Sequence, residues 1–128
     1  MKHIVACFGD MHCGSTVGLC PPEGIELDDG GLYMPNAGQE WLWNNWEEAW
    51  AKVRSTMLHN RGAKLHLVCN GDATDGDHHK STQLATGHEG VHVNCAIESL
   101  RVPLALKPDS IHIIRGTSAH VGRAGGLE

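Results

Sequence analysis

Residues 64–76 read Lys-Leu-His-Leu-Val-Cys-Asn-Gly-Asp-Ala-Thr-Asp-Gly, an apolar run that passes directly into an acidic, glycine-containing turn. A short apolar run bounded by turn residues is typical of a buried strand. The same pattern occurs where His-Ile-Val-Ala-Cys-Phe precedes Gly-Asp, and where Asp-Ser-Ile-His-Ile-Ile-Arg precedes Gly-Thr-Ser-Ala-His. We therefore predict three strands, at residues 3–8, 64–69 and 109–115.

The segments between these strands are typical of helices. Residues 39–59 carry apolar side chains at spacings of three and four, which predicts one helix with a core-facing stripe: Trp43, Trp46, Trp50, Val53 and Met57. A second helix is predicted from about residue 90 to about residue 106, with Pro103 near its end and this apolar face: Val93, Ala96, Ile97, Leu100 and Leu104. The order β-α-β-α-β predicts an α/β fold, a parallel sheet with flanking helices. Residues 14–38, rich in glycine and proline, are predicted to form a long loop.

Length and composition exclude several classes of protein. The 128 residues suffice for one domain, and no stretch is apolar enough for a membrane span or a signal peptide. The five cysteines contain no C-x-x-C pair, which argues against a zinc ribbon or disulfide framework and favours the cytoplasm; Cys7 and Cys69 are expected to be small core residues. A net charge of −5 with scattered lysines and arginines disfavours a surface for duplex nucleic acid.

Each predicted strand ends in a cluster of Gly, Asp and His. Asp10 and His12 follow the first strand, Asp72 and Asp75 the second, and His120 the third. In open α/β sheets ligands bind beyond the carboxyl ends of the strands, so these side chains are expected to converge. Each cluster taken alone also fits an ordinary polar turn. The three together indicate a site, and carboxylates with imidazoles suit Mn, Fe or Zn better than Ca or Mg.

The clusters resemble the motifs of the calcineurin-like metallophosphoesterase superfamily. The first two motifs are Asp10-Met11-His12 and Gly71-Asp72-Ala73-Thr74-Asp75. The third, Gly116-Thr117-Ser118-Ala119-His120, is similar to a Gly-Thr-x-Ala-His variant of phage-encoded members, as is the continuation Gly76-Asp77-His78-His79. The resemblance implies that residues 1–128 form the N-terminal part of one metallophosphoesterase-like αββα sandwich.

The resemblance also implies a chemistry. Two divalent metal ions, of the Mn, Fe, Zn or Ni class, share a carboxylate and a hydroxide that attacks phosphorus. Asp10 and His12 would ligate the first metal, and Asp72 would bridge both. His120 would be the catalytic histidine beside the leaving oxygen. Asp75 would orient an imidazole by accepting its other N–H.

The chain departs from the family pattern at two points. The asparagine expected after Gly116 is absent, and Thr117 or Ser118 is a poorer ligand; His78 or His79 either compensates or is an ordinary turn residue. The later Gly-His-x-His element is also absent, so the chain is expected to be an N-terminal portion. Two functions stay open: hydrolysis of a phosphoester, whether small molecule or nucleic acid, and a non-catalytic module that binds one metal or none. A Rossmann-like nucleotide binder is disfavoured, because no G-x-G-x-x-G or P-loop motif is present.

Overall fold

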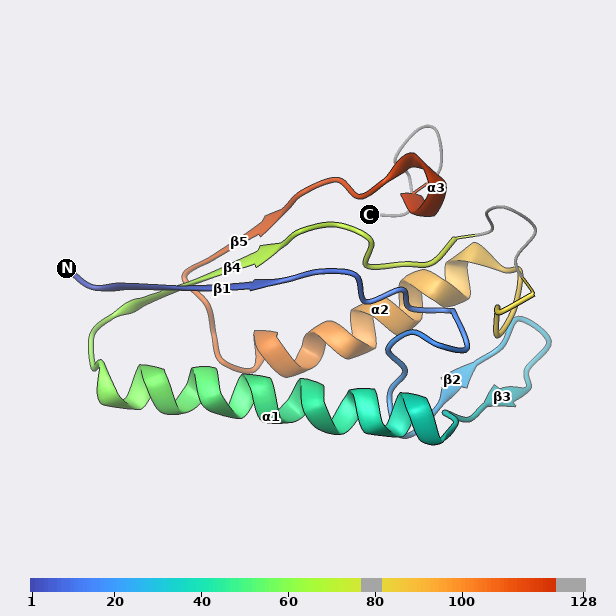
Figure 1. The fold of residues 1–128 in the computed structure, drawn as a ribbon, viewed down its shortest axis with the longest axis horizontal. Helices are drawn as coiled ribbons and strands as arrows, with labels where there is room; N and C mark the ends of the chain where they lie inside the picture. The colour runs from blue at the N-terminus through green and yellow to red at the C-terminus, as the bar shows by residue number, and fades with distance from the viewer. Residues whose placement is uncertain (77–81, 122–128) are drawn as a thin grey trace.

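The computed structural model describes residues 1–76 and 82–121 (Figure 1). The elements, in chain order, are β1 (His3–Phe8), β2 (Ile25–Glu26), β3 (Leu32–Tyr33), α1 (Ala37–His59), β4 (Lys64–Cys69), α2 (Glu89–Leu104), β5 (Ser110–Ile113) and α3 (Ser118–Val121). The predicted strands at residues 3–8 and 64–69 are confirmed, and the third is shorter than predicted. The helix predicted at residues 39–59 begins two residues earlier, at Ala37.

The central sheet contains three parallel strands in the order β1-β4-β5. His3 to Phe8 pair in register with Lys64 to Cys69, and His66 to Cys69 pair with Ser110 to Ile113. The predicted α/β fold with parallel strands is therefore confirmed. Parallel pairing places the carboxyl ends of all three strands at one edge of the sheet, on the right in Figure 1. The αββα sandwich implied by the resemblance stays a prediction.

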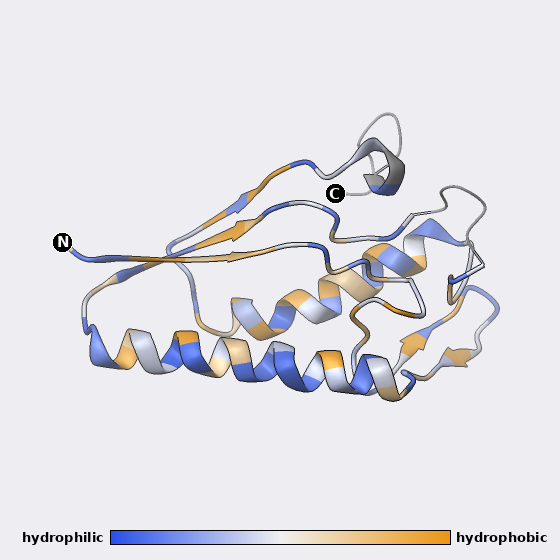
Figure 2. Ribbon diagram, viewed as in Figure 1, coloured by the Kyte–Doolittle hydropathy of each residue, from blue (hydrophilic) through white to orange (hydrophobic). Residues whose placement is uncertain are grey.

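Helices α1 and α2 lie on the same face of the sheet (Figure 1). One cluster of buried side chains joins this face to the helices: Ala6, Trp50, Leu65 and Leu67, with Trp46, Val53, Met57 and Val102 packed against it. The strands are largely hydrophobic, whereas hydrophilic and hydrophobic residues alternate along α1 (Figure 2). On the other face of the sheet, Val5 is 59% exposed and Cys7 is also exposed. The expectation that Cys7 is a core residue was therefore wrong, because residue 7 points away from the helices, and Cys69 is buried as predicted.

A capping box fixes the start of α1. The side chain of Asn36 accepts hydrogen bonds from the backbone N–H groups of Gly38 and Gln39, and Gln39 Oε1 accepts one from the Asn36 N–H. Gln39 is also buried and donates to the carbonyl oxygens of Ser15 and Gly18, at 3.0 and 3.1 Å. This side chain therefore fixes the loop after β1 against the first turn of α1.

The buried face of α2 agrees only in part with the predicted one. Its buried residues are Val91, His92, Cys95, Ala96, Ser99 and Pro103, whereas Ile97 and Leu104 are 50% and 42% exposed. The small residues Cys95 and Ser99 allow the helix to approach the loop after β1. Of the predicted face, Ala96 is buried and Leu100 packs against the core as expected. All five residues of that face also line an apolar groove of about 290 Å³ that includes Ile111 and Ile113 of β5.

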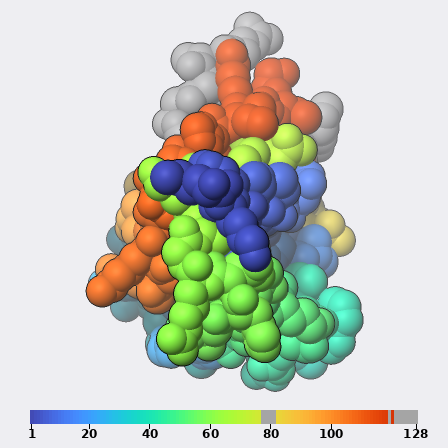
Figure 3. Space-filling view, turned by 90° about the vertical axis from the view of Figure 1, so that its left-hand side faces the viewer, coloured from blue at the N-terminus to red at the C-terminus, as the bar shows by residue number. Residues whose placement is uncertain are grey.

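The predicted loop at residues 14–38 contains a small antiparallel hairpin formed by β2 and β3. Each strand has only two residues, too few for a periodic pattern to identify. At the opposite end of the molecule, where the strands of the central sheet begin, the N-terminal residues and the segment between α1 and β4 form much of the surface (Figure 3). None of the helices in the described residues is long and apolar enough to cross a membrane.

Three cysteines pack together beneath the loop after β1. Cys13, Cys20 and Cys95 are each at most 1% exposed. A side-chain hydrogen bond with Cys95, followed by burial, raises the pKa of Cys20 far above its ordinary value of 9.0. A hydrogen bond with Cys13 is the main cause that raises the pKa of Cys95. Cys20 and Cys95 therefore stay protonated, and all three cysteines act as small core residues.

Candidate metal centre

The loops after β1 and β4 run side by side past the ends of their strands. Backbone hydrogen bonds continue the parallel pairing, from the N–H of Asp10 to the carbonyl oxygen of Gly71 (3.1 Å) and from that of His12 to the carbonyl oxygen of Asp72 (3.0 Å). A third bond joins Cys13 to Ala73 (3.0 Å). The register of the sheet therefore determines how Asp10 and His12 lie relative to Asp72.

Three of the expected ligands have a left-handed backbone conformation. Asp10, His12 and Asp72 have φ angles of 53°, 45° and 54°, and the only other non-glycine residue with positive φ among those described is Lys107. Asp and His tolerate this region better than most side chains, but each such residue still costs about 1–3 kcal/mol. The hydrogen bonds between the two loops hold this strained backbone. Strain of this kind concentrates at functional sites.

Glycines allow the third loop to approach the second. Gly71 has a φ of +83°, and a Cβ on it would lie 2.6 Å from the Cα of Gly116. A Cβ on Gly76, whose φ is +69°, would lie 2.5 Å from the carbonyl oxygen of His120. Both contacts are too close for any side chain. Glycine at positions 71 and 76 therefore allows the segment after β5 to reach the cluster.

The structure brings five of the expected residues together in two overlapping groups. In the first group, ligand atoms of Asp10, His12 and Asp72 all lie within 4.8 Å of one another. The second group meets the same criterion with His12, Asp75 and His120. In the first group, Nε2 of His12 lies 3.8 Å from Oδ1 of Asp10. This donor set of carboxylates and imidazoles fits a divalent transition metal.

The carboxylate of Asp75 faces the Nδ1 atoms of both imidazoles. Its Oδ1 is 3.1 Å from Nδ1 of His12 and 3.6 Å from Nδ1 of His120, and the residue is only 8% exposed. The angle at His12 departs from hydrogen-bond geometry, so the buried Nδ1 has no hydrogen-bond partner among the described residues. A small rotation of the ring would complete a carboxylate–imidazole pair, which would leave Nε2 of His12 as the ligand atom.

His120 lies on α3, a single turn that begins at Ser118. Its Nδ1 is 2.8 Å from the backbone carbonyl oxygen of Asp75, and its ring packs edge-on against that of His12, with centroids 4.5 Å apart. A carbonyl oxygen can only accept, so Nδ1 carries the proton and neutral His120 has its lone pair on Nε2. The short helix, which the sequence pattern did not predict, therefore determines the tautomer of this side chain.

Of the remaining expected residues, Thr117 contacts the site through Asp72. Oδ1 of Asp72 accepts hydrogen bonds from the backbone N–H and the hydroxyl of Thr117, at 2.8 and 3.2 Å. Thr117 therefore orients a carboxylate, and Ser118 begins α3 at an exposed position. His78 and His79 lie outside the described residues.

A cleft of about 570 Å³ adjoins the cluster, and the sequence reasoning did not predict it. Asp10, His12 and Asp75 line it on the side of the cluster, and residues of α1 line it on another: Leu42, Asn45, Trp46 and Ala49. These four positions have the spacing of one helical face, i, i+3, i+4 and i+7, so the sequence does contain a pattern that indicates this face of the helix. The tryptophan stripe favours a core role over a ligand-stacking surface, and the partly buried Trp46 serves both the core and the cleft.

Comparison of the chain with protein family models, with curated proteins and with solved structures found no match. The function is therefore inferred from the residues of this chain and from their arrangement.

Proposed function

We propose that this chain is a metal-dependent phosphoester hydrolase of the metallophosphoesterase type. The observation that carries the proposal is the cluster of Asp10, His12 and Asp72, three potential ligands that all adopt the left-handed conformation where parallel strands end. An ordinary polar turn does not need strained, non-glycine residues at all three of these positions. The motif resemblance described above supports the same function.

The donor chemistry fits Mn, Fe or Zn. Asp10 and Asp72 supply carboxylate oxygens and His12 supplies Nε2, a mixture that Ca and Mg seldom take. A divalent ion bound here would supply Lewis-acid chemistry toward a phosphoryl group and would activate water as a nucleophile. The chain's own residues position these ligands: Thr117 holds the Asp72 carboxylate, and Asp75 faces the Nδ1 of His12.

His120 is proposed as the proton donor to the leaving oxygen. Its Nδ1 is held by the carbonyl oxygen of Asp75, which fixes the ring and leaves Nε2 to exchange a proton with a substrate. The Asp75 carboxylate also faces this ring, with Oδ1 3.6 Å from Nδ1 of His120. Asp75 would then serve both imidazoles, through its carboxylate and through its backbone carbonyl.

One observation favours the alternative, a non-catalytic module that binds a single metal. The two groups of ligand atoms share His12, and a neutral imidazole has only one lone pair. The described residues therefore supply one complete set of three ligands, and a second ion would share the Asp72 carboxylate and need further ligands beyond this set. The number of metal ions bound distinguishes the two functions.

The test combines metal content with hydrolysis. Calorimetric titration with Mn²⁺ and Zn²⁺, checked by mass spectrometry of the metal-loaded protein, gives the stoichiometry, and p-nitrophenyl phosphate and its bis-ester report hydrolysis. We expect two equivalents of metal and a rate that Asp72→Asn lowers by about 100-fold or more. Asparagine retains the acceptor oxygen for Thr117, so the variant should fold. Asp29→Asn, at an exposed turn, is the matched control.

Each outcome has a clear meaning. Two equivalents with hydrolysis that depends on Asp72 support the hydrolase. One equivalent without hydrolysis supports the single-metal module. Hydrolysis that is equally fast in Asp72→Asn contradicts the role of this carboxylate, and a chain that binds no metal contradicts both functions.

A further inference from the structure

We propose that the cleft beside the candidate metal centre binds the organic group of the substrate, and that this group is flat, aromatic and uncharged. The inference rests on the proposed function, because the phosphoryl group would lie at Asp10, His12 and Asp72. The substrate class is then a phosphoester with a single phosphate, such as an aryl or nucleoside phosphate.

The cleft has the size and position for such a group. Its volume of about 570 Å³ falls within the range of about 300–1,000 Å³ typical of small-molecule sites. It extends from Asp10 and His12 to the side of α1 that carries Trp46. A ligand whose phosphate contacted the metal ligands would therefore have its remaining atoms against this helix.

The walls are mainly apolar and one of them is rigid. Leu42 and Trp46 from α1 line the cleft together with Val17 and Leu19 from the loop after β1. The Trp46 indole is fixed because its Nε1 donates to the carbonyl oxygen of Ser99 at 3.2 Å. Its ring also packs edge-on against Phe8 and Trp50, with centroids 5.5 and 5.2 Å apart. A fixed aromatic wall suits a planar group, which loses little conformational freedom on binding.

Apart from Asp10, His12 and Asp75 at the metal centre, the polar side chains that line the cleft are neutral and few. Asn45 lines the cleft, and its Nδ2 donates to the carbonyl oxygen of Trp41 at 2.7 Å. This bond orients the side-chain amide and leaves Oδ1 as a hydrogen-bond acceptor. Ser15 and Gln83 also line the cleft. Oriented amides bind the heteroatoms at the edge of an aromatic ring without requiring charge.

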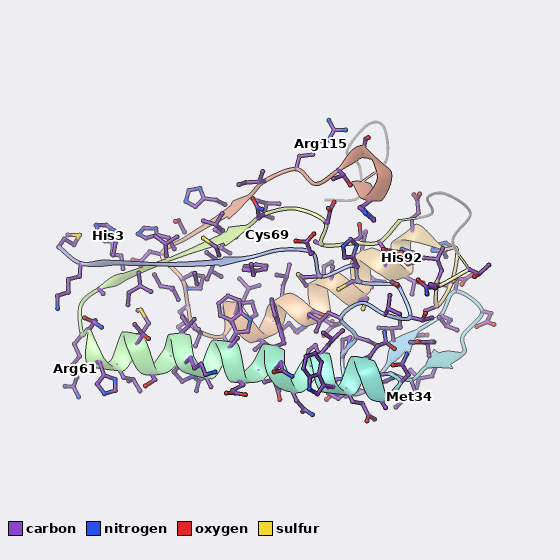
Figure 4. The ribbon with its side chains drawn as sticks, in the orientation of Figure 1. His3, Met34, Arg61, Cys69, His92 and Arg115 are labelled. Carbon is purple, nitrogen blue, oxygen red and sulfur yellow. The ribbon has the colours of Figure 1, made fainter. Side chains whose placement is uncertain are left out.

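The charges of the cleft disfavour a highly anionic substrate, because no cation lines it within residues 1–76 and 82–121. Asp10 and Asp75 carry the fixed charges among the residues that line it, and none of these residues is Lys or Arg. Arg61 lies at the far end of α1, and Arg115 points outward at the edge of the sheet (Figure 4). A second phosphate or a nucleic acid strand that extended into the cleft would meet no cation among the described lining residues. One phosphate at the metal centre, on an uncharged group, needs no such cation.

The test measures binding of two phosphonates that are not hydrolysed. Phenylphosphonate and methylphosphonate are titrated into the Mn²⁺-loaded chain, followed by calorimetry and by tryptophan fluorescence. We expect phenylphosphonate to bind at least about 10-fold more tightly, because its ring buries apolar area against Trp46 and Leu42. Equal affinities would overturn the inference.

A pair of variants on α1 locates the ring. Ala49 lines the cleft and is exposed, so Ala49→Phe should fill the cleft without disturbing the core. Ala51→Phe is the control, since Ala51 is exposed on the same helix and does not line the cleft. We expect Ala49→Phe to weaken phenylphosphonate about 10-fold and to leave methylphosphonate unchanged, and Ala51→Phe to change neither. Equal effects of the two variants, or displacement of phenylphosphonate by a single-stranded oligonucleotide, would overturn the inference.

Titration with Mn²⁺ alone separates this inference from the proposed function. If Mn²⁺ binds and the two phosphonates bind equally, the cleft inference fails and the metal function stands. If Mn²⁺ does not bind but phenylphosphonate binds in a way that Ala49→Phe abolishes, the cleft inference stands and the metal function fails. If Mn²⁺, phenylphosphonate and methylphosphonate all fail to bind, both the cleft inference and the proposed function are overturned.

Discussion

Gly71 lies so close to Gly116 that a Cβ on Gly71 would fall 2.6 Å from the Cα of Gly116. This contact joins the loop after β4 to the segment after β5, one residue away from the hydrogen bonds between Asp72 and Thr117. The close approach therefore determines where Asp72 lies and how far His120 is from Asp75.

Gly71→Ala should destabilise the fold more than the same substitution at another glycine with positive φ. Gly30 is a matched control, because its φ of +82° nearly equals the +83° of Gly71 and nothing lies within 4 Å of its Cβ position. Gly30→Ala should cost about 1–2 kcal/mol, the strain of a left-handed alanine. Gly71→Ala should cost at least about 2 kcal/mol more, since backbone must also move. Urea unfolding measures both, and equal costs would show that the approach to Gly116 is unimportant.

Asp75→Asn should weaken metal binding while the chain remains folded. An amide cannot stabilise the imidazole of His12 as a carboxylate does, and removal of such outer partners lowers metal affinity by about 10–100-fold. The backbone carbonyl that holds His120 remains in place. Calorimetric titration with Mn²⁺ measures the effect, with circular dichroism as the check on folding. An affinity equal to that of the Asp29→Asn control would contradict the role of Asp75.

Gln39→Ala should destabilise the fold more than the loss of a typical polar side chain from a helix surface. The side chain accepts from the Tyr33 hydroxyl at 2.8 Å and from the N–H of Asn36, and donates to two buried carbonyl oxygens in the loop after β1. Leaving these groups without partners should cost about 2–4 kcal/mol. Glu40→Ala, at the exposed neighbouring position, should cost less than about 1 kcal/mol. Thermal or urea unfolding tests the difference, and similar costs would contradict it.

The thiols should differ in reactivity. Cys7 is exposed and should react rapidly with a disulfide reagent at pH 8, whereas Cys20 and Cys95, buried with raised pKa values, should react only on unfolding. The raised pKa also predicts a pH effect. Above the ordinary value of about 9 the unfolded chain loses thiol protons that the folded chain keeps, so stability falls as the pH rises and is unaffected well below pH 9.

Unfolding at several pH values checks this sign. Cys20→Ala should reduce the loss of stability above pH 9, and Cys7→Ser should not. Rapid reaction of all five thiols in the folded chain would contradict the packing of Cys20 against Cys95.

The sheet was predictable because its signals are local. The runs at residues 3–8 and 64–69 are continuous, apolar and bounded by turn residues, and both strands have these bounds in the structure. The face of α2 was predictable only in part, because Cys95 and Ser99 are buried through their small size rather than their hydrophobicity. The hairpin of β2 and β3 was missed because two residues carry no period.

The pattern of apolar runs and turns was enough to predict parallel strands, and therefore that one edge of the sheet gathers five side chains: Asp10, His12, Asp72, Asp75 and His120. Side-chain pattern alone carries that information, because parallel strands must end at one edge. Three features came from the packing of the folded chain: the left-handed backbone of three of these residues, the position of the Asp75 carboxylate facing two imidazoles, and the cleft beside α1. Those features depend on the distance between loops and on how a helix lies against them, and neither is encoded in the pattern of any single segment.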